Sequence, residues 1–248
     1  MAKHDFSTHR LFVTQPLAKG NRFILDREQA NYLVNVLRLG EGDGFLVFNG
    51  KEGEWQARLS GGSRKSPEVE VFIQVRSQPV PSDLWYLFAP LKSARLDYMV
   101  QKAVEMGATR LVPVLTRRTQ VTRINLERMR ANVIEAAEQC GILVVAEVTD
   151  EVTLPKLLED WPRDRTLVFC DEDAPVKDPV TALQAVAQGS PLAVLIGPEG
   201  GFDEAERSML AKVPGHLRLS LGPRILRADT AAVAALALVQ GVLGDYLG

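Results

Sequence analysis

The sequence predicts an α/β protein with a mainly parallel sheet, preceded by a smaller region of short strands. From Asp83 onward, apolar segments with strand-like and helix-like periods alternate, which is typical of a parallel sheet with crossover helices. Residues 10–75 contain shorter apolar segments separated by glycines, the pattern of a small antiparallel barrel. Between them, SQPVPS (residues 77–82) has the composition of a linker. We therefore expect two domains, residues 1–76 and 77–248.

Within the first region, one helix interrupts the strands. Asp26 is a suitable N-cap, and Leu33, Val36 and Leu37 are spaced to share one face. The helix is expected to end at Arg38. The expected strands are residues 45–48, 55–59 and 69–75.

The second region begins with a strand and an amphipathic helix. Leu96, Met99, Val100 and Ala103 mark one helix face, and Gly107 is the expected left-handed residue at its end. A second helix is predicted for residues 126–139. The expected strands are residues 84–89, 111–115, 143–146, 167–170 and 192–196.

Composition and charge narrow the class of protein. The 248 residues are 46% hydrophobic and 24% charged, as in an ordinary globular protein, and the net charge is −2. Residues 92–130 nevertheless hold nine Lys or Arg against three acids, while residues 135–173 hold eleven acids against three bases. A basic segment of this kind suits a polyanion, although a solvated helix face explains it equally well from charge alone.

Cysteine and histidine are too few for a metal cluster or a disulfide framework. Cys140 and Cys170 lie far apart, and the chain has three histidines. The first ten residues, MAKHDFSTHR, lack the apolar segment of a signal peptide, and the longest apolar run, residues 231–239, is too short to span a bilayer. We expect a cytoplasmic protein without a bound metal or a membrane partner.

The ligand site is predicted at two loops rich in glycine and proline. LIGPEGGFDEAE (residues 195–206) joins a strand to a helix through four Gly or Pro residues, and Asp203 with Glu206 fits a capping box. LSLGPRILRADTA (residues 219–231) repeats the arrangement before a long alanine-rich helix. Two such loops after neighbouring strands can form opposite walls of one pocket. The loop at residues 170–173, with Asp171, Glu172 and Asp173, is a candidate third wall.

The usual nucleotide-binding motifs are missing from these loops. There is no GK[ST] of a P-loop and no GxGxxG of a dinucleotide fold. A glycine turn without any ligand is the competing interpretation.

Three stretches resemble one known family. GPEGGF and LGPRILRADTA, together with LKSARLDYMVQKAVEMGATRLVPVLTRRTQ, are similar to the RsmE family of 16S ribosomal RNA uridine N3-methyltransferases, which belong to the SPOUT class. The resemblance implies a methyltransferase domain tied in a trefoil knot that binds S-adenosyl-L-methionine (AdoMet), preceded by a PUA-like RNA-binding barrel. It also implies a homodimer that acts on ribosomal RNA, with the assembled small subunit as the expected substrate.

The resemblance and the paired loops together assign the site residues. Residues expected to bind AdoMet are Ile196, Gly197, Glu199, Gly200, Gly201, Leu219, Leu221, Gly222, Ile225, Leu226, Arg227 and Thr230. Leu221, Ile225 and Leu226 are candidates for an adenine pocket or for ordinary core. Residues expected to contact RNA are Arg10, Arg38, Lys92 and Arg117.

The chemistry requires a way to handle the N3 proton of uridine. Arg227 and Glu199 are the candidate catalytic residues, because a cation can stabilise the uridine anion and a carboxylate can accept the proton. Asp229 stands where the family commonly has glutamate, and its shorter side chain favours a helix cap over a base. The alternatives are that Glu199 shapes its loop and that Arg227 pairs with one of the carboxylates.

Two departures and two other functions remain open. Ile142 and Ala146 replace an arginine and a proline that are usual in the family, which puts a contact to RNA or to the dimer partner in doubt. The alternative functions are a non-catalytic RNA-binding protein with a degenerate knot domain and a phosphate-binding α/β enzyme. Binding of AdoMet would separate the first interpretation from both.

Overall fold

The computed structural model describes residues 8–121, 123–171 and 173–245. The chain divides into two compact units, which we describe separately. The β unit comprises Met1–Val80 and Ala137–Val145, and the α/β unit comprises Pro81–Ala136 and Ala146–Gly248. Within the described ranges, no helix has both the length and the apolar character needed to cross a membrane.

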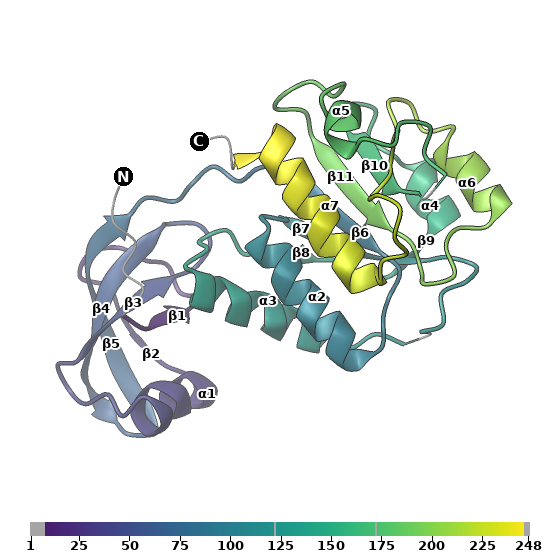
Figure 1. Ribbon diagram of the computed structural model, residues 1–248. Coiled ribbons are helices and arrows are strands. Elements are labelled where there is room, and N and C mark those ends of the chain that lie inside the picture. The colour runs from purple at the N-terminus through teal and green to yellow at the C-terminus, as the bar shows by residue number, and fades with distance from the viewer. Residues whose placement is uncertain (1–7, 122, 172, 246–248) are drawn as a thin grey trace. The chain divides into compact units, whose positions relative to one another are not determined.

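The β unit is built on one five-stranded sheet (Figure 1). Its strand order is β1-β3-β4-β5-β2, with β3, β4 and β5 antiparallel in sequence order and β1 parallel to β3. All three strands expected in this region are confirmed, and β4 and β5 are longer than predicted. The bounds are β1 (Arg10–Phe12), β2 (Arg22–Ile24), β3 (Gly44–Phe48), β4 (Glu54–Ser63) and β5 (Ser66–Arg76).

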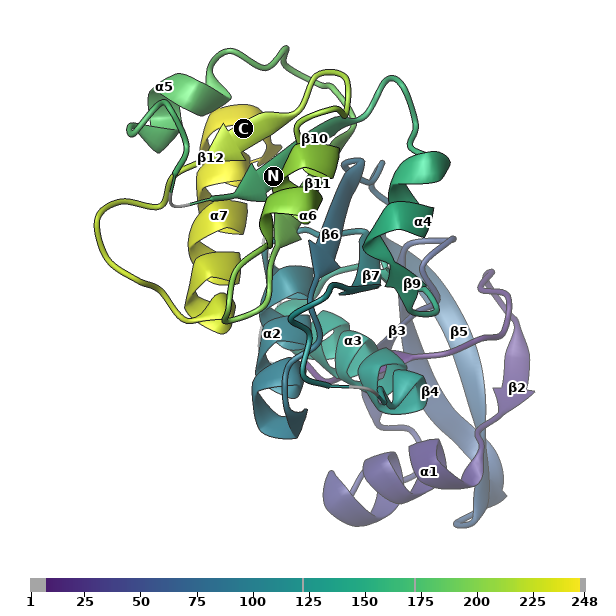
Figure 2. The ribbon, with the colours of Figure 1, turned by 90° about the vertical axis from the view of Figure 1, so that its right-hand side faces the viewer.

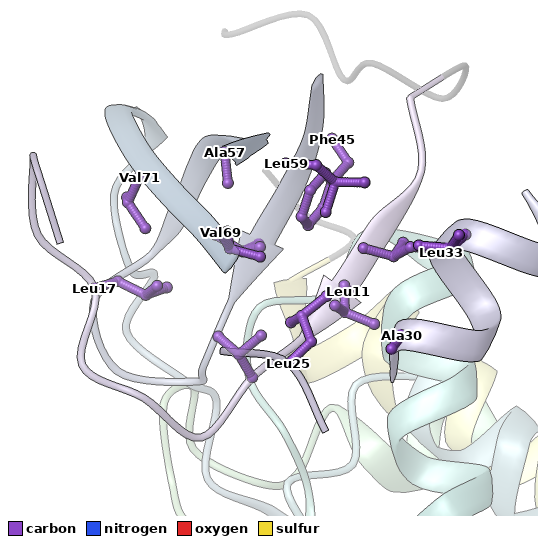
Figure 3. Close-up of a cluster of buried hydrophobic side chains, with 13 residues drawn as sticks. Leu11, Leu17, Leu25, Ala30, Leu33, Phe45, Ala57, Leu59, Val69 and Val71 are labelled. Atoms are coloured by element: carbon purple, nitrogen blue, oxygen red, sulfur yellow. The ribbon is translucent and has the colours of Figure 1, made fainter. Parts of the chain in front are cut away.

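The core of the β unit lies between the sheet and the helical segment (Figure 3). Alternate residues of β5, Val69 and Val71, are fully buried there together with Phe45 of β3. Such alternation is what a sheet with one covered face requires. Leu33 contributes from the helical segment and is also fully buried.

That helical segment begins as predicted and then changes its period. Asp26 caps α1 (Arg27–Ala30), with its carboxylate accepting from the backbone N–H of Gln29 at 2.8 Å. The chain continues as a π-helical turn, η1 (Asn31–Val36). The wider turn buries Leu33 and Val34 and leaves Val36 61% exposed, so the prediction that Val36 shares the buried face was wrong.

Seven strands form the sheet of the α/β unit, and all of the recorded pairings are parallel. The order is β12-β10-β11-β6-β7-β8, and β9 pairs with β7. The bounds are β6 (Leu84–Phe88), β7 (Arg110–Leu115), β8 (Glu147–Val148), β9 (Val152–Thr153), β10 (Thr166–Cys170), β11 (Leu192–Ile196) and β12 (Leu217–Leu219).

One predicted strand of this sheet was wrong. Residues 143–146 do not form a strand, and β8 begins only at Glu147. Leu143 instead packs with Phe48 and Ala137 in a small apolar cluster of the β unit. Leu143 is therefore apolar because it is buried in this cluster and not because it belongs to a strand.

Helices cover both faces of the parallel sheet (Figure 2). Leu154 of α4 and Leu210 of α6 lie in one cluster with Leu87, Ala193 and Leu195 of the strands. On the other face, Tyr86 donates its hydroxyl to the sulfur of Met99 in α2. The bounds are α2 (Ser93–Glu105), α3 (Leu126–Cys140), α4 (Leu154–Glu159), α5 (Pro179–Leu183), α6 (Glu204–Leu210) and α7 (Ala228–Leu243).

The predicted face of α2 is confirmed. Leu96, Met99, Val100 and Ala103 are all buried, and Gly107 follows the helix with φ of 79°. A side chain at Gly107 would meet the amide of Gln240 in α7, so the left-handed turn also permits close packing of these two helices.

Candidate active site

A cavity of about 650 Å³ opens at the carboxyl ends of β10, β11 and β12. This is the edge at which ligands bind in open α/β sheets, and the volume suits a nucleoside-sized ligand. Both loops predicted from the sequence line it. The expected residues in its walls are Ile196, Gly197, Glu199, Gly200, Gly201, Leu219, Leu221, Gly222, Ile225 and Leu226.

The β11–α6 loop forms one wall and is held by its own helix. Asp203 accepts a hydrogen bond from the backbone N–H of Glu206 at 2.8 Å, and the Glu206 side chain returns to the backbone N–H of Asp203 at 3.0 Å. A side chain at Gly197 would come within 2.9 Å of the Phe202 ring. Gly201 has φ of 68°, a conformation that favours glycine. The predicted capping box is therefore confirmed, and the loop depends on its glycines.

The loop between β12 and α7 forms the opposite wall. Gly222 has φ of 91°, and Ile225 is fully exposed at 102% of its reference area. Arg227 and Thr230, which we expected at the cofactor, are exposed and lie outside the cavity lining. Arg227 occupies the N-cap position of α7.

Charged residues complete a third wall. Asp171 lines the cavity, is 3% exposed and accepts from Nη2 of Arg218 at 2.9 Å. Lys177 and Arg207 line the cavity beside it, and so does Cys170. The sequence predicted a third wall at residues 170–173 but not the contribution of Lys177 and Arg207. Glu172, which belongs to the same prediction, lies outside the described residues.

Both carboxylates considered for proton transfer are bound by one arginine. Nε and Nη2 of Arg95 donate to the two oxygens of Asp229 at 3.0 and 3.1 Å, and its Nη1 donates to Glu199. These hydrogen bonds are the main reason why the pKa of Asp229 is lowered. Asp229 is not the N-cap residue itself, but it lies in the first turn of α7 and accepts from the backbone N–H of Thr230 at 3.0 Å, so it also stabilises the start of that helix.

Exposed arginines surround the β11–α6 loop. The side chain of Arg117 is 71% exposed and pairs with Asp203 at 3.1 Å, while its backbone N–H donates to Glu206 at 2.7 Å. Arg118 donates to the carbonyl oxygen of Gly200 at 2.5 Å. Lys92 is exposed at the N-cap of α2. The basic segment therefore lies partly on the loop that forms the cavity wall.

In the β unit, the two arginines expected at RNA differ in their surroundings. Arg10 is buried, and its Nε donates to Glu54 at 2.8 Å. Its guanidinium stabilises the interior of this unit, so the expected RNA contact is replaced by a structural role. Arg38 is exposed at φ of 59°, and with Arg64 it lines a second cavity of about 560 Å³.

No group of three His, Cys, Asp or Glu side chains is arranged to hold a metal ion in the part of the chain that the structure describes.

Comparison with known proteins identifies the class of this fold and pocket. A family model described as an RNA methyltransferase domain matches residues 78–240, and one described as an RNA methyltransferase PUA domain matches residues 25–72. Fold, cavity and both family models define an RNA methyltransferase with a PUA domain, as the resemblance implied.

Individual relatives narrow the class to one family. The ribosomal RNA small subunit methyltransferase E of Synechocystis is 33% identical over 88% of this chain and 73% of the relative, and that of Rickettsia conorii is 29% identical over 96% and 97%. A crystal structure of the enzyme of this name from Neisseria gonorrhoeae, bound to S-adenosyl methionine, has a TM-score of 0.87 at 28% identity and covers 96% of this chain and 99% of that one. The chain belongs to the ribosomal RNA small subunit methyltransferase E family.

Sequence reasoning missed Arg95, although it lies within a stretch that carried the resemblance. Its partners Glu199 and Asp229 are 104 and 134 residues away, so no local pattern connects them. Arg118, Arg207 and Arg218 were missed for the same reason.

Proposed function

We propose that this protein transfers a methyl group from AdoMet to N3 of a uridine in 16S ribosomal RNA. The observation that carries the proposal is the cavity between two Gly-Pro loops at the carboxyl ends of β10, β11 and β12, in a chain of this family. The related Neisseria gonorrhoeae enzyme is described as bound to S-adenosyl methionine.

The residues around the cavity fit AdoMet. Leu221 and Leu226 offer apolar surface for a purine ring, and the glycines of both loops allow close approach to backbone groups. Lys177 and Arg207 can attract a carboxylate, and Asp171 can accept hydrogen bonds from an amine or hydroxyl. When bound, AdoMet supplies a methyl group that is already activated on a sulfonium, so the protein chiefly has to position the uridine.

The remaining task is the N3 proton of uridine. A carboxylate whose two oxygens are held by a guanidinium is a weak base, which argues against proton transfer to Asp229. Arg227 is exposed at the N-terminus of α7, next to the lining residues Leu226 and Ala228. We assign Arg227 the role of stabilising the uridine anion and Glu199, a carboxylate of the cavity lining, the role of accepting the proton.

Exposed cations supply the RNA-binding surface in this proposal. Lys92 and Arg117 in the α/β unit and Arg38 in the β unit can each contact a phosphate. The assembled small subunit, rather than free ribosomal RNA, is the proposed substrate, and the knot implied by the resemblance belongs to the same proposal.

We propose a homodimer, for which the apolar sequence of α7 predicts an interface on Val233, Leu236, Ala237, Val239 and Gln240. Leu236, Val239 and Gln240 of α7 are 1% exposed and already buried inside the protomer. Val233, Ala234, Ala237 and Leu238 are half-buried at helical spacing and leave a narrow apolar strip on the same helix. This strip is the surface that a second copy would cover.

Nucleoside analysis tests the function directly. Ribosomal RNA from cells lacking the gene should lack N3-methyluridine in the small subunit, and the purified protein with AdoMet should restore it. Since the methyl group blocks the pairing edge of uridine, reverse transcriptase should stop at the modified base only when the gene is present. A stop that persists in the deletion strain would reject the assigned substrate. Absence of both methylation and calorimetric binding of AdoMet would instead favour the non-catalytic alternative.

A further inference from the structure

Arg95 connects the two walls of the cofactor cavity without lining the cavity itself. It lies in the first turn of α2, and its partners are Glu199 in the β11–α6 loop and Asp229 in the first turn of α7. All three residues belong to the α/β unit. One side chain thus spans three elements that are remote in the sequence.

The two pairs differ in geometry and in exposure. The fork of Arg95 meets both oxygens of Asp229, which is the most specific arrangement between these groups. Asp229 is 17% exposed, whereas Glu199 is 51% exposed and lies in the cavity lining. Asp229 is also close to the N-terminus of α7, where a negative charge is favoured. The pair between Arg95 and Asp229 is therefore the more firmly held of the two. The pair between Arg95 and Glu199 is the one that includes a residue of the cavity lining.

Each bound carboxylate is next in sequence to a residue of the cavity lining. Glu199 is adjacent to Gly200 in one wall, and Asp229 follows Ala228, which lines the other wall. Movement of Arg95 would release both carboxylates together. Its effect on the site would therefore be transmitted through the backbone of two loops.

We propose that Arg95 is a positioning residue of the methyl transfer, which sets the spacing between the β11–α6 loop and the start of α7. The inference rests on the proposed function, because it assumes that the donor and the uridine meet at this cavity. In this role Arg95 contacts neither the donor nor the uridine. It excludes Asp229 from acting as the base and fixes the angle at which α7 presents Arg227.

Arg110 provides a matched control. It also belongs to the α/β unit, and it pairs through two nitrogens with Glu147 at 2.9 and 3.3 Å. Its side chain is 33% exposed, against 32% for Arg95. Arg110 does not line the cavity. Any effect of losing one half-buried arginine pair as such should therefore appear in both alanine variants.

The first test uses the free protein, so that it does not depend on the reaction. Amide hydrogen exchange should accelerate in residues 197–203 and 222–230 of Arg95→Ala and remain at the wild-type level there in Arg110→Ala. Arg95→Lys, which keeps the charge but loses the fork, should give an intermediate rate. Wild-type exchange in both loops of Arg95→Ala would overturn the proposal, even if the protein proves to have no methyltransferase activity.

The second test separates positioning from general destabilisation. The affinity for AdoMet, measured by calorimetry, should fall about tenfold in Arg95→Ala, the size expected when one charged hydrogen-bonded pair is lost. Starting from Asp229→Asn, the same substitution should cost less, because only the pair between Arg95 and Glu199 is left to be lost. At saturating AdoMet, kcat should still be reduced in Arg95→Ala and partly recovered in Arg95→Lys. Full kcat, or additive effects of the two substitutions, would contradict the assigned role. An inactive wild-type protein with the expected exchange pattern would reject the proposed function and leave the positioning role intact.

Discussion

Arg10 and Glu54 form a buried ion pair in the β unit, with Nε and Oε1 2.8 Å apart and side chains only 4% and 3% exposed. Arg76 donates to the same carboxylate at 2.7 and 2.9 Å. Two guanidinium groups thus share one carboxylate inside the unit that we had expected to present Arg10 to RNA. Such a group of charges is stable only while all of its members are present.

Glu54→Gln should therefore destabilise the protein strongly. Removing the carboxylate leaves Arg10 and Arg76 without their shared charge, a change that typically costs about 3–5 kcal/mol. Urea unfolding followed by circular dichroism measures this loss. Arg22→Ala is the control, because Arg22 is 54% exposed and Glu70 keeps its pair with Arg58 when Arg22 is removed, so the stability of this variant should be close to wild type. Equal effects of the two substitutions would contradict the structural role of Arg10 and Glu54.

The same carboxylate makes stability depend on pH. Burial raises the pKa of Glu54, but the hydrogen bonds and charges of Arg76 and Arg10 outweigh it, and the pKa is lowered overall. A lowered pKa in the folded state contributes stability above the unfolded value of about 4.3, and this contribution is lost as the pH falls through the folded pKa. The difference in free energy of unfolding between wild type and Glu54→Gln should therefore shrink below about pH 4. If this difference in free energy of unfolding grew as the pH fell, the pKa of Glu54 could not be lowered in the folded state.

Gly201→Val should weaken AdoMet binding. Gly201 lines the cavity at φ of 68°, where a β-branched side chain strains the loop and fills its approach. Gly215 has the same φ of 68° outside the cavity lining, so Gly215→Val introduces the same local strain elsewhere. Calorimetry should show a loss of affinity of about tenfold or more for Gly201→Val only, since strain of this kind costs about 1–3 kcal/mol. Comparable losses in both variants would indicate a general effect on the fold.

Arg38→Glu should weaken RNA binding and its salt dependence. Arg38 is exposed beside Arg64 at the cavity of the β unit, where a phosphate can reach it. Loss of one phosphate contact should reduce the slope of log affinity against log salt by about one. Filter binding to small-subunit ribosomal RNA between low and moderate salt measures both quantities. Lys51→Glu changes an exposed cation of the same unit that does not line this cavity, and an equal loss there would favour net charge as the cause.

Arg227→Ala should abolish most methylation while AdoMet still binds. Arg227 is outside the cavity lining, so the cofactor should not depend on it, whereas a fixed cation near the uridine is worth about 100-fold in rate. Single-turnover methylation and calorimetry separate the two effects. Arg224 lies three residues earlier in the same loop and lines the cavity. Arg224→Ala should show the opposite balance, with cofactor affinity affected more than the rate. Wild-type turnover by folded Arg227→Ala would reject its assigned role.

Leu238→Arg should convert a dimer into a monomer. Leu238 is half-buried on the apolar strip of α7, and a charge there would have to be buried in the proposed interface. Light scattering at micromolar concentration should give twice the chain mass for wild type and the chain mass for the variant. Lys212→Glu changes an exposed residue elsewhere in the same unit and should stay dimeric. A monomeric wild type would reject the dimer.

Local patterns in the sequence predicted much of the fold. The buried face of α2, the N-cap at Asp26 and the capping box at Asp203 follow from residues within a few positions of one another, and all are present. The order of the strands did not follow from the sequence, and neither did the pairing of Arg95 with two distant carboxylates, because both depend on contacts across the sheet. Val36 was misplaced because its periodicity assumes 3.6 residues per turn, which the π-helical turn breaks.

Cys170 lies in the third wall of the cofactor cavity, where the protonation state of its sulfur decides whether it can itself be methylated. Desolvation, with a smaller contribution from Asp171, raises the pKa of its thiol to about 12. Thiolates rather than thiols are the reactive nucleophiles, so this sulfur stays almost entirely protonated at neutral pH. A sulfonium bound nearby is a strong electrophile, and an ionised sulfur in the wall would compete with the RNA for its methyl group. A thiol that stays protonated should not compete with the RNA for the methyl group, and we expect Cys170 to react slowly with iodoacetamide.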